Sequence, residues 1–373
     1  MTVPLHRQLM LAVLSACVAV PVPGSAQATG STLASSADSY LREKEAAGWS
    51  GAVIIEHRGQ VILRAGYGMA DRERNVRFTT RTIAQIGSLT KQFTAAAIAT
   101  LAREGRLAFT DSLGGHVPEV RGAVRTVTLH ELLTHSSGLP QDCGRDFERI
   151  TSAGLVSRCL NGASLETRGR YAYSNLGYSV LGIVAERASG QSLEAYMEAR
   201  FFRPLGLKTI AYTYPGLPHP TGTAVCYMNG RAQRPIADRI AELDGAFWIL
   251  KGNGGLQASV DEMYLWYRAL RDEKALPRDL VRTLLTPQVP HTTAGVAYGY
   301  GWNVRLDSAD RVVQASHTGS DGVCWAAIVW RPVDDGFIYV TGNADTRVSG
   351  EIASTLLRMM RDQSAGVDQK GRR

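Results

Sequence analysis

Several motifs that would assign a function at once are missing from this sequence of 373 residues. It has no Cys-x-x-Cys pair, which argues against dithiol redox chemistry and a structural zinc site. It has no Gly-x-Ser-x-Gly turn, which argues against an α/β-hydrolase nucleophile elbow. The stretch "GNGGLQ" at residues 252–257 lacks the third glycine of a dinucleotide-binding loop. We therefore expect neither a metal nor an organic cofactor.

A strong excess of charge of one sign is also missing. The formal net charge is +7, from 41 Lys and Arg against 34 Asp and Glu, and the basic residues are scattered. A basic stripe with interleaved aromatic residues, typical of nucleic-acid binding, is not present. Beyond the first residues, no apolar run is long enough to span a bilayer. The expected partner is a small-molecule or peptide substrate, and the sequence leaves the oligomeric state open.

The N-terminus has the layout of a secretory signal peptide. Arg7 precedes the apolar run "LMLAVLSACVAVPVPG", and "SAQA" then offers small residues for cleavage after Ala28. A second interpretation is that "LSAC" is a lipoprotein box that would anchor the chain through Cys17. We expect residues 1–28 to be the signal peptide and the protein to be periplasmic or secreted.

Cysteine is scarce, and four cysteines remain after the predicted cleavage. Cys143 and Cys159 flank a polar, loop-like segment and could form a disulfide in an oxidising compartment. Spacing alone does not establish that pairing. Cys226 and Cys324 lie in apolar, strand-like runs, so we expect them to be buried thiols.

The order of the expected elements favours an α+β fold. Residues 36–47 read as an amphipathic helix, and two β-branched runs around "HRGQ" read as a hairpin. Helical segments are then expected at 88–104, 128–134, 176–190, 192–201 and 259–272. They are followed by strand-like runs at 298–306, 311–319, 322–332 and 336–344 and a helix at 349–363.

The first and last parts of the chain can combine into one antiparallel sheet flanked by the terminal helices. This sheet lobe takes in about 36–87 and 296–362, and residues 88–295 form a largely helical second lobe. Together they make a single domain of residues 29–362, before a polar tail at 363–373 that we expect to be disordered. Ser88 stands where sheet and insert join and should lie in the cleft between the lobes.

Ser88 and Lys91 form a Ser-x-x-Lys motif near a predicted helix start. Residues three apart share a helix face, so the amine can reach the hydroxyl. A serine hydroxyl is a weak nucleophile until a base takes its proton, and a desolvated lysine can be that base. The apolar neighbours, such as Phe93, make desolvation plausible. The alternative is a purely structural role, in which Ser88 caps the helix and Lys91 extends its amine to solvent.

Two further stretches of the sequence argue against a purely structural role for Ser88 and Lys91. "RYAYSNLGYS" holds Tyr173, Ser174 and Asn175 ahead of an apolar helix, and "ASHTGSDG" holds a His-Thr-Gly run between two strand-like runs. With these motifs in this order, the chain resembles the serine β-lactamase and penicillin-binding-protein superfamily. It resembles most the branch of class C β-lactamases and DD-peptidases. Flanking support comes from "LLTHSSGL", "PLGL", "GGLQASVDEMYLW" and "YGYGW".

The resemblance implies a β-lactamase/transpeptidase-like fold and a role for each matching residue. Ser88 would be the acylated nucleophile, Lys91 would assist its deprotonation, and Tyr173 would relay a proton to the leaving group or act as deacylation base. The implied substrate-binding residues are Asn175, His317, Thr318, Gly319 and Ser320. Among these, the backbone N–H groups of Ser88 and Ser320 would form the oxyanion hole.

The third motif departs from the Lys-Thr-Gly that is usual in β-lactamases of this branch. His317 stands in place of the lysine, and histidine is mostly neutral at pH 7. If His317 contacts a substrate carboxylate, KM for such substrates should rise between pH 6 and 8. The sequence thus favours an exported serine hydrolase that acts on amides or esters. The alternatives are a class C-like β-lactamase and a non-catalytic sensor of penicillin or peptidoglycan.

Overall fold

A computed structural model describes residues 26–213, 222–344 and 346–370. Its centre is an eight-stranded antiparallel sheet in the order β2-β1-β14-β13-β12-β11-β10-β9. The strands of this sheet are β1 (Gly51–His57), β2 (Gln60–Tyr67), β9 (Val289–Pro290), β10 (Val296–Tyr298), β11 (Asn303–Leu306), β12 (Val312–Ser320), β13 (Trp325–Arg331) and β14 (Gly336–Gly342). The first hairpin of the chain therefore pairs with its last strands, as the sequence predicts.

Turn chemistry accounts for the tight β1–β2 hairpin. His57 pairs with Gln60, which leaves Arg58 and Gly59 as the two turn residues. Their φ angles are 53° and 74°, and a turn with two positive φ angles matches the twist of the strands it joins. Glycine adopts that conformation without steric cost. Short strand pairs outside the main sheet are β3 (Met69–Asp71) with β4 (Val76–Arg77), β5 (Ile83–Gln85) with β8 (Gln257–Ser259), and β6 (Tyr227–Met228) with β7 (Arg231–Ala232).

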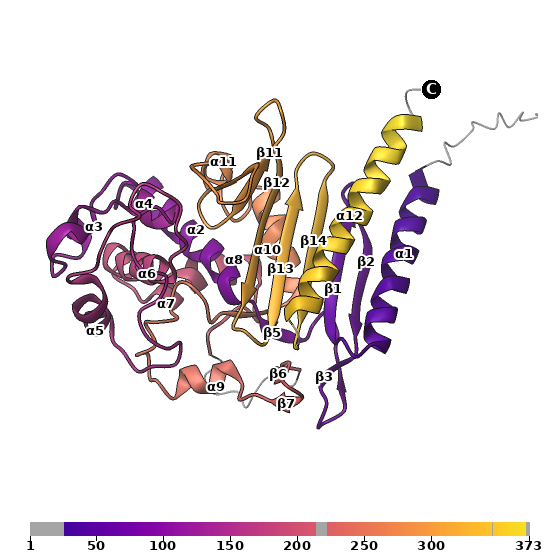
Figure 1. The fold of residues 1–373 in the computed structure, drawn as a ribbon, viewed down its shortest axis with the longest axis horizontal. Coiled ribbons are helices and arrows are strands. Elements are labelled where there is room, and N and C mark those ends of the chain that lie inside the picture. The colour runs from indigo at the N-terminus through magenta and orange to yellow at the C-terminus, as the bar shows by residue number, and fades with distance from the viewer. Residues whose placement is uncertain (1–25, 214–221, 345, 371–373) are drawn as a thin grey trace, which may run out of the picture.

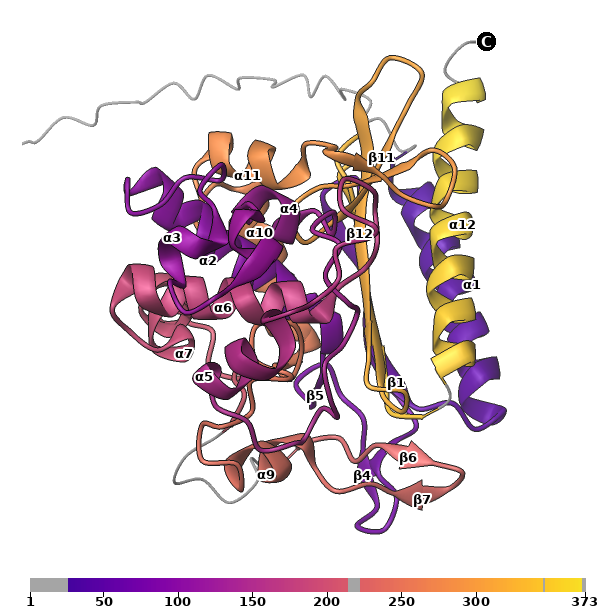
Figure 2. The ribbon, with the colours of Figure 1, turned by 60° about the vertical axis from the view of Figure 1, so that its left-hand side comes forward.

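Helices cover both faces of the sheet (Figures 1 and 2). One face carries the two terminal helices, α1 (Ala26–Ala46) and α12 (Thr346–Lys370), which pack side by side through residues such as Leu41 and Leu356. The other face carries the helical lobe. Because both faces are covered, every residue of the three central strands β1, β13 and β14 is buried.

The helical lobe contains the segments expected from the sequence and several that were not expected. The expected segments appear as α2 (Thr90–Arg103), α4 (Leu129–Leu133), α6 (Asn175–Ser189), α7 (Leu193–Met197) and α10 (Val260–Arg271). The additional helices are α3 (Leu113–His116), α5 (Ser152–Leu155), α8 (Arg203–Leu205), α9 (Ile236–Ala241) and α11 (Arg278–Leu285). Single turns of other helix types lie at Gly87–Leu89, Gly122–Thr126, Val156–Leu160 and Glu198–Phe202.

Three boundaries differ from those expected. Ser88 lies in the 3₁₀ turn Gly87–Leu89 that precedes α2, not within the α-helix itself. Strand β9 begins at Val289, so the sheet extends into the segment that we assigned to the helical lobe. Helix α12 continues to Lys370, past the start of the expected disordered tail at residue 363, and its apolar residues pack against the sheet as far as Met360. The predicted signal peptide lies outside the described residues except for 26–28.

Two disulfides correct the cysteine prediction. Cys143 is bonded to Cys159, which is the pairing that the sequence left open. Cys226 is bonded to Cys324, so the expectation of two buried thiols is wrong. These cysteines are 98 residues apart, and the fold brings Cys226, just before β6, to Cys324 in the loop after β12. Among the described residues, no helix is both long enough and apolar enough to cross a membrane.

Candidate active site

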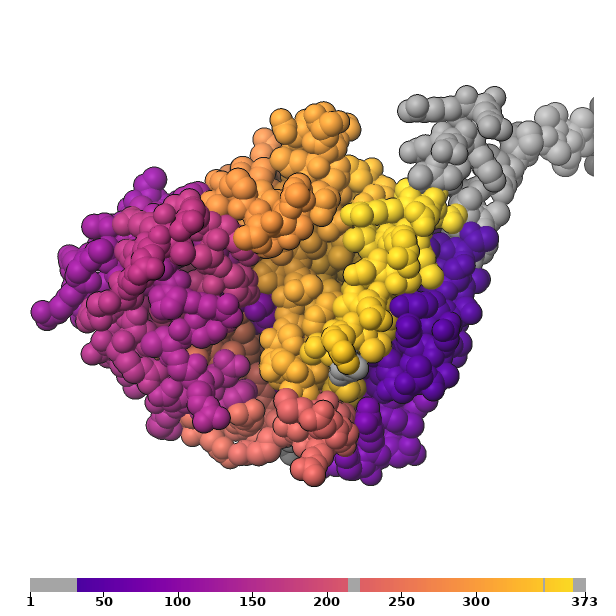
Figure 3. All heavy atoms as spheres, in the orientation of Figure 1, coloured from indigo at the N-terminus to yellow at the C-terminus, as the bar shows by residue number. Residues whose placement is uncertain are grey.

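Ser88 lies in a turn that packs between the sheet and the helical lobe. The turn Gly87–Leu89 follows β5 and leads directly into α2. Gly87 has a φ of 50°, and a Cβ on it would lie 2.5 Å from the backbone nitrogen of Ser320. Ser88 itself is partly exposed. Figure 3 shows a hollow between the helices of the left-hand lobe and the strand layer of β12 and β13.

The amine of Lys91 is fully buried and is held by three acceptors. Its Nζ donates to Ser88 Oγ at 3.0 Å, to Asn175 Oδ1 at 2.7 Å and to the backbone oxygen of Asn253 at 2.8 Å. Burial holds the pKa of Lys91 well below its ordinary value, although the carboxylates of Asp142 and Asp146 oppose this effect. A neutral amine next to a serine hydroxyl can accept the hydroxyl proton.

Tyr173 completes a group of three reactive side chains. The Lys91 Nζ lies 4.8 Å from the centre of the Tyr173 ring. Burial raises the pKa of the Tyr173 phenol, and a hydrogen bond with Ser88 lowers it in part. The phenol therefore keeps its proton at neutral pH. The structure brings Ser88, Lys91 and Tyr173 together, as the motifs predict, although they come from two distant segments.

Asn175 links the lysine to the mouth of the cleft. It is the first residue of α6, and Ser174 caps that helix by accepting from the Gly177 N–H. While Oδ1 of Asn175 accepts from Lys91, its Nδ2 donates to Asp142 Oδ1 at 2.8 Å. The amide is thereby fixed in one orientation with its oxygen toward the amine.

Strand β12 approaches the Ser88 turn so closely that only glycine fits. A Cβ on Gly319 would lie 1.9 Å from the Ile86 oxygen and 2.8 Å from the Ser88 nitrogen. The backbone nitrogens of Ser88 and Ser320 therefore both lie at this close contact between the turn and β12. The Ser320 hydroxyl is turned away, since it donates to the Cys324 oxygen at 2.9 Å.

His317 is uncharged and is engaged on both ring nitrogens. Nδ1 donates to the Thr318 oxygen at 2.7 Å, and Nε2 accepts from the Tyr298 hydroxyl at 3.0 Å. Burial and the nearby charge of Lys91 lower the pKa of His317 to about 3. The imidazole is thus neutral between pH 6 and 8. Thr318 itself is exposed on β12, next to this buried ring.

The carboxylates of Asp142, Asp146 and Asp321 lie near one another. Burial raises the pKa of Asp146, and the neighbouring carboxylates Asp142 and Asp321 raise it further. Arg239 is the counter-charge, and its guanidinium lies 3.3 Å from the centre of the Phe147 ring. Electrostatically, this group of carboxylates favours a neutral or cationic ligand over one that carries a carboxylate.

Sequence reasoning missed several of the residues that complete the site. Asn253 provides a backbone acceptor for Lys91, and His135 packs its ring 4.3 Å from that of Tyr173. Tyr298 holds His317. The segments "LLTHSSGL", "GGLQ" and "YGYGW" mark these places, yet only as parts of a family resemblance. Their contacts with the site depend on tertiary packing.

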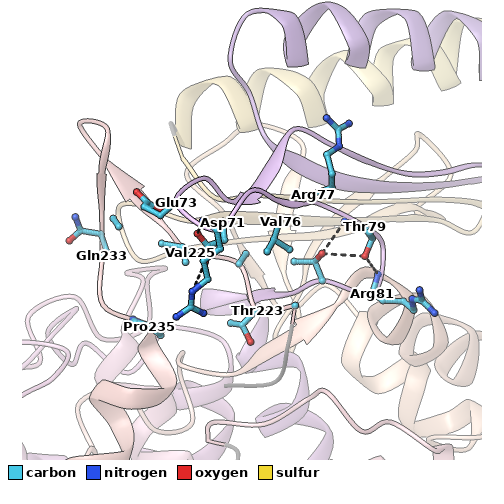
Figure 4. A pocket seen from close by; sticks show the side chains of 15 residues that line it. Asp71, Glu73, Val76, Arg77, Thr79, Arg81, Thr223, Val225, Gln233 and Pro235 are labelled. Atoms are coloured by element: carbon cyan, nitrogen blue, oxygen red, sulfur yellow. Dashed lines mark hydrogen bonds and ion pairs between the residues drawn. The ribbon is translucent and has the colours of Figure 1, made fainter. Parts of the chain in front are cut away.

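A separate cavity of about 890 Å³ lies beside β3 and β4, and Figure 4 shows its lining. None of the predicted site residues lines it. Its lining includes Asp71 and Arg74, which form an ion pair at 3.7 Å, and Arg77, which pairs with Glu45 at 2.8 Å. In the part of the chain that the structure describes, no three His, Cys, Asp or Glu side chains are placed to hold a metal ion.

Known proteins are similar to this chain over most of its length. Residues 38–357 match the model of the family described as Beta-lactamase. Protein flp of Staphylococcus aureus (strain MW2) is 32% identical over 167 residues, which are 42% of this chain and 33% of that protein. PbpX of Bacillus subtilis (strain 168), named as a penicillin-binding protein, is 29% identical over 280 residues, or 71% of this chain and 64% of its own length. The chain thus spans less than two thirds of either relative.

Solved structures share the fold. The octameric penicillin-binding protein homologue from Pyrococcus abyssi has a TM-score of 0.75 and 26% identity, over 88% of this chain and 77% of that one. A penicillin binding protein from Bacillus halodurans has a TM-score of 0.72 and 24% identity, over 86% of this chain and 99% of that one. At that identity, the second comparison supports the fold alone.

Proposed function

Because the chain belongs to the beta-lactamase family, we propose that it hydrolyses amides or esters through an acyl-enzyme on Ser88. Membership confirms the family resemblance of the motifs, and it supports a kind of protein that acylates a serine. One observation carries the proposal of an acyl-enzyme on Ser88: the buried amine of Lys91 lies 3.0 Å from the Ser88 hydroxyl. A desolvated amine at that distance is a competent base.

In the proposed acylation step, Ser88 Oγ attacks the substrate carbonyl carbon and its proton passes to the neutral amine of Lys91. The developing oxyanion accepts hydrogen bonds from the N–H groups of Ser88 and Ser320. The intermediate then collapses, the bond to the leaving amine or alcohol breaks, Tyr173 delivers its proton to that group, and the proton held by Lys91 restores the phenol. The raised pKa of Tyr173 favours this donor role over that of a phenolate base. Water then attacks the acyl carbon and gives a proton to the neutral amine of Lys91, the bond from the acyl carbon to Ser88 Oγ breaks, Ser88 Oγ regains a proton from that amine, and the acid is released.

The charges around the cleft support a substrate without a carboxylate near the third motif. His317 is neutral and both of its nitrogens are engaged, so it offers a carboxylate no cation. Asp142 and Asp146 lie close enough to Lys91 to act on its pKa, and they would repel an anion. A β-lactam carries a carboxylate, so these charges favour the amidase or esterase proposal over the class C-like β-lactamase.

A simple set of assays tests the proposal. Turnover of p-nitrophenyl acetate, a chromogenic cephalosporin and a D-Ala-D-Ala peptide is measured with wild type and Ser88→Ala. We expect Ser88→Ala to lower kcat on the ester by on the order of 10³-fold or more. Ser354→Ala is the matched control, because Ser354 is exposed on α12 and its hydroxyl donates to the Gly350 oxygen of the same helix. Full turnover by Ser88→Ala would overturn the mechanism.

Intact mass spectrometry separates the remaining alternatives. An acyl adduct that maps to Ser88 and decays with turnover supports the hydrolase. A stable adduct without turnover would instead support the sensor. Faster hydrolysis of the cephalosporin than of either other substrate would support the β-lactamase alternative.

Export is a second part of the proposal. The two disulfides support it, because such bonds persist in oxidising compartments. The signal-peptide layout of residues 1–28 supports it independently. Sequencing of the mature N-terminus after expression in a bacterium distinguishes the outcomes. A start at Thr29 supports cleavage after Ala28, a lipidated start at Cys17 supports the lipoprotein alternative, and an intact Met1 contradicts both.

A further inference from the structure

We propose that His135 is the positioning residue for Tyr173, an inference that rests on the proposed function. His135 follows α4 and belongs to the segment "LLTHSSGL". Its side chain is completely buried, and its φ is 58°, in a region that is uncommon for residues other than glycine. Such strain persists only where the surroundings enforce it, and it is concentrated at functional sites.

His135 contacts the chain on both sides of Tyr173. The Ala172 N–H donates to the His135 backbone oxygen at 2.7 Å, and the Ser174 N–H donates to His135 Nδ1 at 3.0 Å. Between these two hydrogen bonds, the imidazole ring packs against the Tyr173 ring with centroids 4.3 Å apart. One residue thereby fixes both the backbone before and after the tyrosine and one face of its ring.

The bond from Ser174 also sets the protonation state of His135. Nδ1 accepts a hydrogen, so the neutral ring carries its own hydrogen on Nε2. An imidazolium would place a hydrogen on Nδ1 and break this bond. Burial and the nearby charge of Lys91 keep the pKa of His135 well below its ordinary value, which maintains the acceptor.

His135 does not act as a base or a donor in this proposal. Tyr171, Tyr178 and Tyr298 surround its ring with centroids 5.9, 5.1 and 4.6 Å away. Its Nε2 has no hydrogen-bond partner among the described residues. Aromatic rings therefore enclose the imidazole, and the effect of His135 on the reaction passes through the position of Tyr173.

A double-mutant cycle on p-nitrophenyl acetate tests this role. His135→Gly removes the acceptor and the ring, and glycine tolerates the positive φ. We expect kcat to fall by on the order of 10-fold to 10²-fold with KM little changed, because a misplaced proton donor slows the chemical step. In the Tyr173→Phe background, the same substitution should change kcat by less than about twofold. An equal loss in both backgrounds would show a purely structural role and overturn the proposal.

His135→Asn is the matched variant, because asparagine also tolerates positive φ and its Oδ1 can accept from Ser174. It should restore most of the lost rate, and failure to do so would count against the hydrogen bond to Ser174. If His135→Gly does not fold, His135→Ala replaces it in the cycle, since alanine accepts no hydrogen bond and its small side chain is strained less at positive φ than a bulky one. Thermal unfolding of every variant confirms that it is folded.

Crystal structures give a readout that does not depend on turnover. In His135→Gly, or in its replacement, we expect the Tyr173 ring to move away from the Lys91 amine, which lies 4.8 Å from its centre in the wild type. An unmoved ring would overturn the proposal. A different result would overturn the proposed function itself, namely a turnover in Ser88→Ala that equals that of the wild type.

Discussion

At the scale of single residues, the burial of Lys91 determines how turnover should depend on pH. The amine is useful as a base only when it is neutral, and its pKa lies well below 10.5. As the pH rises through that lowered pKa, the neutral fraction and therefore kcat/KM for a neutral ester should rise. We expect the inflection well below pH 10.5 in a pH profile of the wild type.

Lys91→Arg tests the same point by substitution. Arginine keeps the positive charge but does not lose its proton in the accessible pH range. We expect kcat to fall by about 10²-fold to 10⁴-fold, the range typical of a lost general base. A variant that kept both the rate and the inflection would show that the base lies elsewhere.

His317 leads to a second prediction, which revises the expectation from the sequence. Since its pKa is lowered to about 3, the ring does not change charge between pH 6 and 8. KM for a carboxylate-bearing ester should therefore depend on pH in the same way as KM for a neutral ester across that range. Michaelis–Menten measurements on the two esters check this expectation, and a selective rise for the anionic ester would contradict it.

The lowered pKa of His317 also affects stability. Between pH 3 and the ordinary histidine value of 6.5, the unfolded chain binds more protons than the folded chain does. The free energy of unfolding should therefore fall as the pH drops from about 6.5 toward 3. In urea titrations at pH 7 and pH 4.5, His317→Asn should show a smaller loss than the wild type. An identical loss in both proteins would exclude this contribution.

At the scale of elements, the contact between β12 and the Ser88 turn should tolerate no added methyl group at Gly319. Gly319→Ala would place a Cβ 1.9 Å from the Ile86 oxygen, so the strand and the turn must separate. A shift of about 1 Å in such a site can lower kcat by about 10²-fold. We expect a loss of that order, measured on p-nitrophenyl acetate, together with a lower Tm.

Gly350→Ala is the control for this substitution. Gly350 lies in α12, and the nearest atom to an added Cβ is 3.9 Å away. Alanine favours the helix by about 0.5–1 kcal/mol, so Tm should stay the same or rise while kcat is unchanged. Similar kcat values for Gly319→Ala and Gly350→Ala would show that the close approach does not matter for the reaction.

The same contact shows where prediction from sequence succeeds at the element scale. Ser88 and Lys91 are three residues apart, and local spacing was enough to predict that their side chains meet. The positions of β1, β13 and β14 follow from their apolar runs. The 3₁₀ turn at Ser88 was missed because the close approach of β12, not local propensity, shapes that turn. Helix α11 was missed because its amphipathic pattern spans only Arg278–Leu285.

At the scale of the whole molecule, the two disulfides should differ in their effect on stability. Cys226–Cys324 closes a loop of 98 residues, and Cys143–Cys159 closes one of 16. In the chain-entropy model the longer loop contributes about 4.7 kcal/mol and the shorter one about 3 kcal/mol. Replacing both cysteines of the longer loop with serine should therefore lower the free energy of unfolding more, by about 1–2 kcal/mol. Urea unfolding of the two double variants tests the order, and the reverse order would contradict it.

The sequence does not reveal long-range features such as the Cys226–Cys324 disulfide. Cys226 lies in an apolar run that reads as strand, and nothing local marks Cys324 as its partner. His135 is a similar case, because its contacts with Ala172 and Ser174 join segments almost 40 residues apart. Tyr173 was predicted only because its motif occurs in a known order with two others.

The packing of α1 against α12 has a practical consequence. The two helices run side by side, and Gln363 near the end of α12 donates to Thr32 near the start of α1 at 3.4 Å (Figure 1). Both lie on the face of the sheet opposite the helical lobe (Figure 2). A short linker between them would allow circular permutation, with new ends opened at the exposed turn of residues 307–311. Fusion partners or surface attachment could then be moved around the molecule while the cleft stays open.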